Sequence, residues 1–320
     1  MLTILTVSSF SAETDQYTTR SQQMADSLNQ INQIANEHLI TAINSANQSQ
    51  GCNNIANDKY VLYTHLKKEF ANHSKGEFTK KILHLDSLDT HVIPLKESVY
   101  GKWSIFNGFL LGRKKAASSP LALSPLIKLN GYRVGIDKLE HMFGMGFIYF
   151  KQHHLKNRKL QRVLKGGILR EKTALGGNIL ATGVFSYADL AANFNGMRFW
   201  NHMLQLEDDV LGKSYNIGPY IKCIQGEWTV NKEIDFSDYI DESMDESINC
   251  SKFASRSGLK KYKAAIKSID SSYKCPMSND KVRAMELKYK TRLNKQRSIS
   301  DWIINTNGIG KVKYFREFKK

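Results

Sequence analysis

The apolar positions in the first part of the chain follow a helical period. Residues 14–47 contain no glycine or proline, and apolar side chains recur there every three or four positions. This spacing predicts one long amphipathic helix, or two shorter ones, with a polar outer face. A cluster of glycine and asparagine at residues 51–54 ends the pattern. Residues 57–85 predict a second helix followed by an extended piece.

The pattern changes across residues 90–130, where prolines and glycines interrupt short apolar runs. This composition is typical of extended segments and loops, and it is compatible with a hairpin. Helical spacing then returns in five segments, at 136–154, 157–171, 187–206, 252–268 and 279–297. Strand-like runs lie at 220–224 and 228–230. The predicted fold class is therefore mainly α, a helical bundle-like core with a few short strands or extended loops.

The composition is that of a globular protein. The chain has 320 residues, of which 41% are hydrophobic and 24% charged. Such a chain can bury a sizeable core and does not resemble a disordered segment. No stretch reaches the roughly 18 consecutive apolar residues that suggest a membrane-spanning helix. We therefore predict no transmembrane helix.

Charge is distributed unevenly along the chain, whose formal net charge is +16. Acidic residues crowd into 233–246, whereas 252–320 is rich in lysine and arginine. This change predicts two regions. The first is a main helical domain over 13–232. The second, over 233–320, is an acidic linker with a basic, disulfide-stapled helical C-terminal region.

The basic region suggests a class of partner. Residues 252–320 suit anionic lipid headgroups or other polyanions. Nucleic acid is a weaker alternative, because aromatic residues are sparse there and no nucleic-acid-binding motif occurs. The plainer interpretation is an acidic loop that lies near a basic helical face.

The first twelve residues resemble the end of a secretory signal. The run Leu2–Phe10 is short and made of apolar and small residues, and the sequence turns polar after Ala12. This pattern predicts cleavage after Ala12, so that 1–12 is the remnant of a signal peptide and the protein is periplasmic or secreted. The run has no basic start and is at the short end of the range, and its alternative interpretation is a first β-strand.

The cysteines are compatible with export. The chain has four of them, and no two form a Cys-x-x-Cys pair, which excludes zinc-ribbon and thioredoxin-type motifs. In an oxidising compartment three pairings are open, and at least one bridge is expected within the C-terminal third. The predicted disulfide cysteines, with their pairing left open, are Cys52, Cys223, Cys250 and Cys275.

The chemically richest stretch begins at Asp137. Asp137 and His141 are four residues apart, so on a helix they share one face, one turn apart. The helix that follows is apolar on nearly every side, which predicts that both side chains are covered. Glu171 lies near the end of another apolar helical run, between the glycine pairs 166–167 and 176–177. Those glycines predict the close approach of another backbone or a ligand.

A third motif opens the helix predicted at 187–206. Ser186 and Asp189 fit the N-cap and N3 positions of a capping box, with aspartate in place of the usual glutamate. Four residues then recur at i, i+4, i+7 and i+11 and share one stripe: Asp189, Asn193, Gly196 and Trp200. We expect this stripe to face another helix across a polar cleft.

The order of these motifs resembles that of VanZ-like proteins and related envelope proteins. It reads Asp-Lys-x-x-His, then a glutamate, then Ser-x-x-Asp-Leu-x-Ala-Asn-x-x-Gly, and it covers only about residues 135–200. VanZ-like proteins are bundles of membrane helices, whereas this chain has no predicted spanning segment and adds long terminal regions. The resemblance implies a shared site and no particular reaction. By similarity that site comprises Asp137, Lys138, His141, Glu171, Ser186, Asp189, Asn193 and Gly196.

Three roles are open to the charged members of this set. As metal ligands, imidazole and carboxylates suit a divalent ion such as zinc, and the candidate ligands are Asp137, His141, Glu171 and Asp189. As an acid–base set, the catalytic residues are His141, Glu171 and Asp189. The corresponding candidates for substrate binding are Lys138, Ser186, Asn193, Gly196 and Trp200. The third role is a buried polar network that locks helices together.

Two classes of function follow for an exported envelope protein. The first is a metal-assisted or acid–base hydrolase that acts on an envelope component. The second is a non-catalytic envelope or headgroup-binding protein, in which the polar helix junction is structural and the basic region at 252–320 contributes to binding. The sequence leaves both open.

Overall fold

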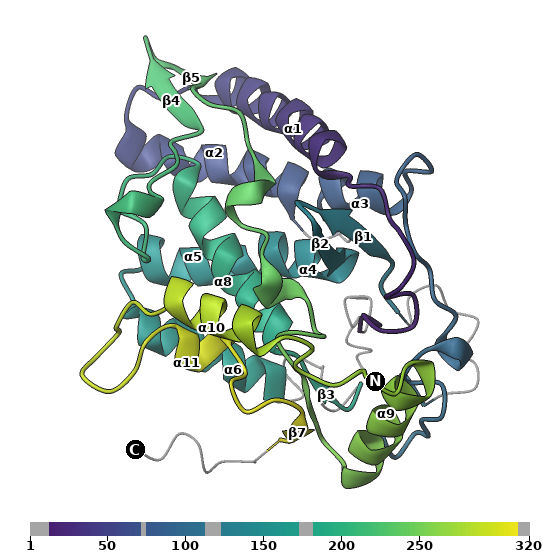
Figure 1. Cartoon of the computed structure of the whole chain (residues 1–320). Helices are drawn as coiled ribbons and strands as arrows, with labels where there is room; N and C mark the ends of the chain where they lie inside the picture. The colour runs from purple at the N-terminus through teal and green to yellow at the C-terminus, as the bar shows by residue number, and fades with distance from the viewer. Residues whose placement is uncertain (1–12, 72–74, 113–122, 173–181, 313–320) are drawn as a thin grey trace, which may run out of the picture.

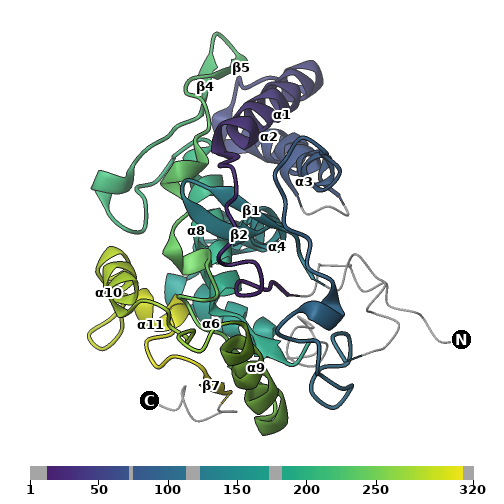
Figure 2. The ribbon, with the colours of Figure 1, turned by 45° about the vertical axis from the view of Figure 1, so that its right-hand side comes forward.

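Helix α8 (Tyr187–His202) runs through the middle of the molecule, with the other helices arranged around it (Figures 1 and 2). The structure is a computed structural model that describes residues 13–71, 75–112, 123–172 and 182–312. Within these ranges the protein is mainly helical with a few short strands, which confirms the predicted fold class. The predicted signal-peptide remnant at 1–12 lies outside them.

The elements follow one another as single helices and short hairpins. The helices are α1 (Leu28–Ser49), α2 (Ile55–Phe70), α3 (Glu77–Leu83), α4 (Ile136–Glu140), α5 (Gly146–Phe150), α6 (Leu160–Lys172), α8, α9 (Arg256–Ile269), α10 (Asn279–Lys288) and α11 (Ser300–Ile303). The strands are β1 (Leu126–Leu129), β2 (Tyr132–Gly135), β3 (Val184–Phe185), β4 (Ile221–Ile224), β5 (Glu227–Val230), β6 (Lys252–Phe253) and β7 (Gly310–Lys311). The short 3₁₀ helices are η1 (Leu95–Glu97), η5 (Lys213–Tyr215), η6 (Phe236–Asp238) and η7 (Glu242–Met244).

The helix predicted at 136–154 is one continuous rod with two π-helical stretches. Elements α4 and α5 are joined by η3 (His141–Met145), and α5 continues into η4 (Lys151–Leu155), where η3 and η4 are both π-helical. A π-helical turn leaves backbone groups outside the usual ladder. The carbonyl of Phe143, within η3, accepts a hydrogen bond from Trp200 Nε1 at 3.0 Å.

Helix α8 packs directly on this rod. Every residue of α8 from Ala188 to His202 is buried. A Cβ on Gly196 would lie 1.9 Å from the carbonyl oxygen of Met142, and one on Gly146 would lie 2.6 Å from the Cα of Gly196. The two backbones are therefore in close contact because both glycines lack side chains. The predicted stripe does face another helix, but across a packed junction rather than the polar cleft that the sequence suggested.

The N-terminal prediction was partly wrong. Helix α1 begins at Leu28, whereas 14–27 is not helical. The carboxylate of Asp15 accepts hydrogen bonds from the backbone N–H groups of Tyr17, Thr18 and Val99, which offer the backbone a turn in place of a helix. This arrangement ties the residues after position 12 into the core.

Two further boundaries differ from the sequence prediction. The piece expected to be extended before residue 85 contains helix α3, whose Phe78 packs in the core against Phe143 with ring centroids 5.3 Å apart. Helix α10 ends at Lys288, so the predicted continuation to 297 is wrong. Within 90–130 the expected hairpin forms at its end, because β1 pairs antiparallel with β2 through the turn at Asn130 and Gly131, which both have positive φ.

The sheets are small and join distant parts of the chain. β4 and β5 coincide with the strand-like runs predicted at 220–224 and 228–230, and they form a second antiparallel hairpin. β6 pairs antiparallel with β3 and parallel with β7. Because β3 leads directly into α8, this pairing brings residues 252–253 and 310–311 to the start of the central helix. Contacts therefore cross the predicted boundary at residue 232.

All four cysteines form disulfides. Cys52 pairs with Cys223 and Cys250 with Cys275, so one bridge lies in the C-terminal third, as expected. Disulfides persist in oxidising compartments, so both bridges are compatible with a secreted or envelope protein. None of the helices that the structure describes is both long enough and apolar enough to cross a membrane.

Candidate functional site

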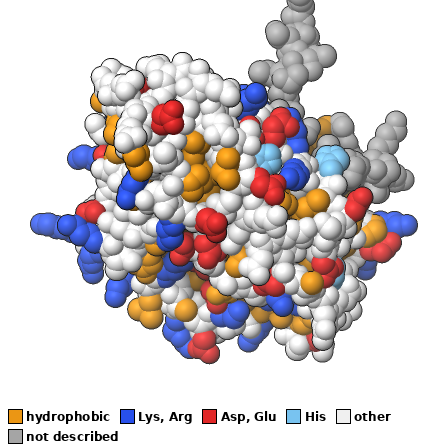
Figure 3. Space-filling view, turned by 90° about the horizontal axis from the view of Figure 1, so that it is seen from above, with side chains coloured by type: hydrophobic (Ala, Val, Ile, Leu, Met, Phe, Trp, Pro, Cys, Tyr) orange, Lys and Arg blue, Asp and Glu red, His pale blue; other side chains and the backbone are white. Residues whose placement is uncertain are grey.

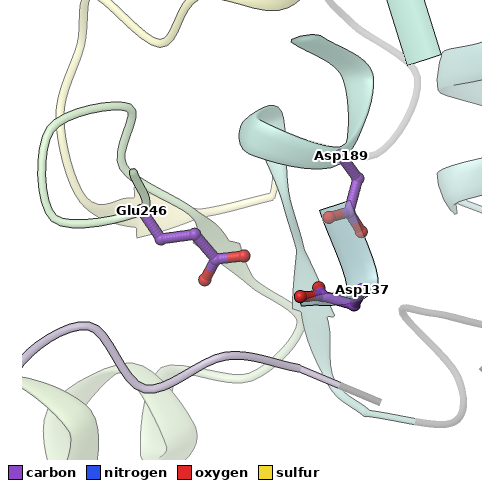
Figure 4. Close-up of side chains that lie close together, drawn as sticks. All are labelled: Asp137, Asp189 and Glu246. Carbon is purple, nitrogen blue, oxygen red and sulfur yellow. The ribbon is translucent and has the colours of Figure 1, made fainter. Parts of the chain in front are cut away.

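Three carboxylates converge on one buried lysine in the core. The Nζ atom of Lys138 lies 2.6 Å from Asp137 Oδ2, 2.6 Å from Asp189 Oδ1 and 2.7 Å from Glu246 Oε1. The Lys138 side chain is 0% exposed. The three acids point toward one another from α4, from α8 and from the segment after η7 (Figure 4). We call these four residues the lysine–carboxylate cluster.

Hydroxyl groups from further segments complete this cluster. Thr14 Oγ1 donates to Asp137 Oδ1 at 2.7 Å, and Ser186 Oγ donates to Glu246 Oε1 at 2.9 Å. Ser186 Oγ also accepts from the backbone N–H of Asp189 at 3.2 Å, which confirms its predicted place as N-cap of α8. The same serine thus begins the helix and orients an acid of the cluster.

The lysine and the carboxylates determine one another's charge. Burial alone would lower the pKa of Lys138, but its three carboxylate neighbours outweigh that effect and hold the pKa well above its ordinary value. Burial would likewise raise the pKa of Asp189, yet the charges of His141 and Lys138 lower it. The pKa of Glu246 is raised, because burial and the neighbouring aspartates exceed the effect of Lys138. The core therefore holds a lysine ammonium and at least one ionised acid.

His141 joins this cluster to the stripe on α8. Its Nε2 lies 3.3 Å from Asp189 Oδ2, and its Nδ1 lies 3.1 Å from Asn193 Oδ1. His141 therefore lies on the helix that the Asp189–Asn193 stripe faces, in agreement with the prediction that this stripe faces another helix. Both ring nitrogens face protein oxygens, so the imidazole is held in place by the two α8 side chains.

The other predicted site residues have different surroundings. Glu171 is buried at the end of α6 and lies outside the group of carboxylates that surrounds Lys138. Its charge acts on Tyr149, whose pKa it raises in addition to the larger effect of burial. Gly196 and Trp200 make the packing and backbone contacts between α8 and the helical rod. These two residues are buried in the helix junction.

The geometry does not fit the zinc site predicted from Asp137, His141, Glu171 and Asp189. The carboxylates close enough to share an ion are instead Asp137, Asp189 and Glu246, whose ligand atoms lie within 4.8 Å of one another. Lys138 Nζ already donates to all three. An ammonium group thus takes the position that a divalent cation would need. The arrangement favours the third role, a buried polar network.

Sequence reasoning missed several members of this network. Glu246 was seen only as part of an acidic segment and Thr14 only as part of a predicted helix, and Glu13 was not singled out. Glu13 is 1% exposed, and its Oε1 accepts a hydrogen bond from Thr182 Oγ1 at 2.5 Å. Burial raises the pKa of Glu13 well above its ordinary value, and the charges of Glu246 and Asp189 raise it further. No local pattern marks these residues, because their partners lie far away in the sequence.

The raised pKa of Glu13 predicts a pH-dependent stability. The folded state keeps a proton that the unfolded chain releases above about pH 4.3, the ordinary pKa of glutamate. The stabilising contribution of protonated Glu13 to the free energy of unfolding is therefore lost as pH rises through its folded-state pKa. Glu13→Gln keeps an oxygen for Thr182 and removes the titration. We expect this variant to unfold at higher denaturant concentration than the wild type at about pH 8, with the difference shrinking toward about pH 5.

The control for this prediction is an exposed acid. Glu97→Gln changes a side chain that is 60% exposed and should leave the pH profile of the unfolding midpoint unchanged. A Glu13→Gln effect of the same size at every pH would show that packing, and not ionisation, is responsible.

The surface carries a second unusual feature on the loop after η1. Among the described residues, four large apolar side chains are exposed within six positions, Ile105 at 52%, Phe106 at 87%, Phe109 at 47% and Leu110 at 37%. Buried residues anchor the loop between and beside them, namely Trp103, Asn107 and Leu111. We call residues 105–110 the apolar loop.

The apolar loop lies beside the basic helix α9 (Figures 1 and 2). Lys261 Nζ donates to Asn107 Oδ1 at 2.9 Å, and Asn107 Nδ2 donates to Ser255 Oγ at 3.3 Å. Helix α9 contains five basic residues and no acidic ones. Four of the basic residues are exposed and recur at i, i+4, i+7 and i+11, which places them on one stripe: Arg256, Lys260, Lys263 and Lys267.

Other parts of the surface differ from this one. The face seen in Figure 3, at the end of the molecule formed by α1 and the β4–β5 hairpin, mixes acidic and basic side chains. The net positive charge is therefore not distributed evenly over the surface. Part of the acidic segment is also neutralised internally, as in the ion pair of Asp245 with Arg20 at 2.6 Å.

Comparison of the chain with known proteins found no matching family model, no similar curated protein and no similar solved structure. The resemblance to VanZ-like proteins therefore stays a prediction from the motifs.

Proposed function

We propose that this chain is an extracytoplasmic, non-catalytic protein that binds the surface of anionic membranes. The observation that carries the proposal is the apolar loop beside helix α9. Exposed Phe106 and its neighbours can enter the boundary between headgroups and acyl chains, while the basic stripe of α9 attracts anionic lipid headgroups. The proposal develops the headgroup interaction predicted for 252–320 and adds the apolar loop.

The two parts of the surface contribute different energies. Each lysine or arginine near an anionic bilayer contributes about 1 kcal/mol to the binding free energy, and salt weakens this attraction by screening the charges. Burial of a phenylalanine side chain contributes about 2 kcal/mol and does not depend on lipid charge. Binding through both should require anionic lipid and weaken steeply with salt. Binding through the loop alone should tolerate salt.

The test is co-sedimentation of the full chain with phosphatidylcholine vesicles that contain or lack phosphatidylglycerol. We expect binding only with phosphatidylglycerol. Phe106→Ser should weaken it about 30-fold, as the loss of about 2 kcal/mol from one buried aromatic side chain implies. Lys260→Gln with Lys263→Gln and Lys267→Gln should weaken it on the order of 100-fold, at about 1 kcal/mol for each lysine.

A matched apolar control is Leu287→Ser on α10, because Leu287 is 65% exposed and lies outside the apolar loop. It should leave vesicle binding unchanged. Equal losses for Phe106→Ser and Leu287→Ser would contradict the proposed surface. Binding to DNA that falls steeply with salt, without vesicle binding, would support the nucleic-acid alternative instead.

The envelope hydrolase stays a second proposal. The pairing of His141 with Asp189 at 3.3 Å supports it, because a histidine oriented by a carboxylate can act as a general base. It ranks below membrane binding, since Nδ1 of the same ring is held by Asn193. Zinc that copurifies with the protein and is lost in folded His141→Ala would reverse this order.

A further inference from the structure

A pocket separate from the apolar loop lies between the helical rod and α6. Its volume is about 410 Å³, within the range of small-molecule sites. Its wall comes from α5, η4, the turn after η4 and α6. The polar residues that line it are Tyr149, Gln152, Arg158, Arg162 and Arg170.

Three arginines give this pocket its charge. Arg162, Gly166 and Arg170 are spaced by four residues and share one face of α6, while Arg158 lies in the turn before that helix. In the described residues none of the three arginines lies within ion-pair distance of an acidic side chain. Guanidinium groups bind phosphate oxygens through paired hydrogen bonds, so three of them around one pocket favour a phosphate-bearing ligand.

The buried wall supplies a hydrogen-bond donor. Tyr149 is 2% exposed, and its hydroxyl makes no hydrogen bond of good geometry with the described residues. The nearby Asn193 side chain lowers the pKa of this hydroxyl, but the larger effect of burial raises it, so the phenol stays protonated. A buried donor without a hydrogen bond is costly unless a ligand or water accepts from it.

Two glycines shape this wall. A Cβ on Gly167 would lie 1.5 Å from the Tyr149 hydroxyl, so glycine is required for the tyrosine to lie there. A Cβ on Gly166 would meet nothing within 4 Å. Gly166 therefore borders open space between Arg162 and Arg170, and a side chain could be added there without a clash in the protein.

We infer that this pocket binds a small phosphate-bearing ligand, with its phosphate group on Arg158, Arg162 and Arg170 and a hydrogen bond from Tyr149. The inference is independent of membrane binding through the apolar loop.

The test is calorimetric titration of the full chain with inorganic phosphate and with glycerol 3-phosphate. We expect saturable binding of at least one of them. Arg162→Gln and Arg170→Gln should each weaken it at least tenfold, because a hydrogen bond to a charged group contributes about 1.5–3 kcal/mol. Gly166→Leu should abolish binding by filling the pocket, and Gly166→Ala should weaken it much less. Both substitutions favour the helix, so loss of fold is not the expected cause.

Two sources of phosphate are separated with the apolar-loop variant. Phe106→Ser should bind glycerol 3-phosphate as the wild type does, even if it no longer binds vesicles. The Gly166→Leu variant should bind vesicles that contain phosphatidic acid more weakly than the wild type only if the ligand is a lipid headgroup. No heat signal with either phosphate probe and no effect of Gly166→Leu on phosphatidic acid vesicles would together overturn the inference. Binding that survives Gly166→Leu would also overturn it.

Discussion

Lys138→Met should destabilise the folded protein by about 3–5 kcal/mol at neutral pH, the cost of breaking a buried ion pair. The substitution keeps a long apolar stem but removes the one ammonium that contacts Asp137, Asp189 and Glu246. Their carboxylates would then repel one another in the core, or would take up protons. The measurement is the free energy of unfolding from urea titration at several pH values. The loss should be smaller at low pH, where the acids are neutral.

Two further variants distinguish charge from packing. Lys213→Met changes a lysine whose side chain is 85% exposed, and it should have no measurable effect. Lys138→Met combined with Glu246→Gln removes one carboxylate together with the ammonium, and it should recover part of the lost stability. If the double variant is less stable than Lys138→Met alone, packing around Glu246 matters more than repulsion between the acids.

Removal of the Cys52–Cys223 disulfide should cost about 5 kcal/mol, because the bridge joins residues far apart in the chain. The two cysteines are separated by 171 positions, and a long closed loop strongly restricts the unfolded chain. The bridge also fastens the β4–β5 hairpin to the end of α1, where Cys52 N–H donates to the carbonyl of Gly226 at 2.8 Å. Cys52→Ala with Cys223→Ala should lower the free energy of unfolding accordingly.

The second disulfide provides the matched control. Cys250 and Cys275 are separated by 25 positions, for which the same relation gives about 3.5 kcal/mol. Cys250→Ala with Cys275→Ala should therefore be the milder double variant in urea unfolding. A larger loss from this pair would mean that local strain or packing, rather than loop closure, decides the contribution of each bridge.

Elements with a regular apolar period could be predicted from the sequence. The helices around 136–154 and 187–206 were expected because apolar spacing reports directly on a buried helical face. The contact of His141 with Asp189 also followed in part, since His141 was placed on a covered helix face and Asp189 on a stripe that faces another helix. Residues 14–27 were not predicted correctly, because a helical spacing there competes with turns that Asp15 caps through its side chain.

The centre of the candidate site could not be predicted. Lysine is among the residues least often fully buried, so its residue type gave no reason to place Lys138 in the core. Its partner Glu246 lies 108 positions away, and Glu13 contacts Thr182 across 169 positions. Local periodicity carries no information on such pairings. The apolar loop was likewise read only as a short apolar run, because exposure depends on what the rest of the chain covers.

The complete burial of α8 has a consequence for how this protein can evolve. A helix with an outward face can change on that face without affecting its neighbours, whereas α8 from Ala188 onward has no such face. A single residue inserted after Asp189 would rotate every later side chain of α8 by about 100° about the helix axis. Asn193 and Gly196 would then lose their contacts with His141 and Met142, while Asp189 kept its own. Relatives that share this fold should therefore preserve the spacing of this helix even where the surrounding surface has diverged.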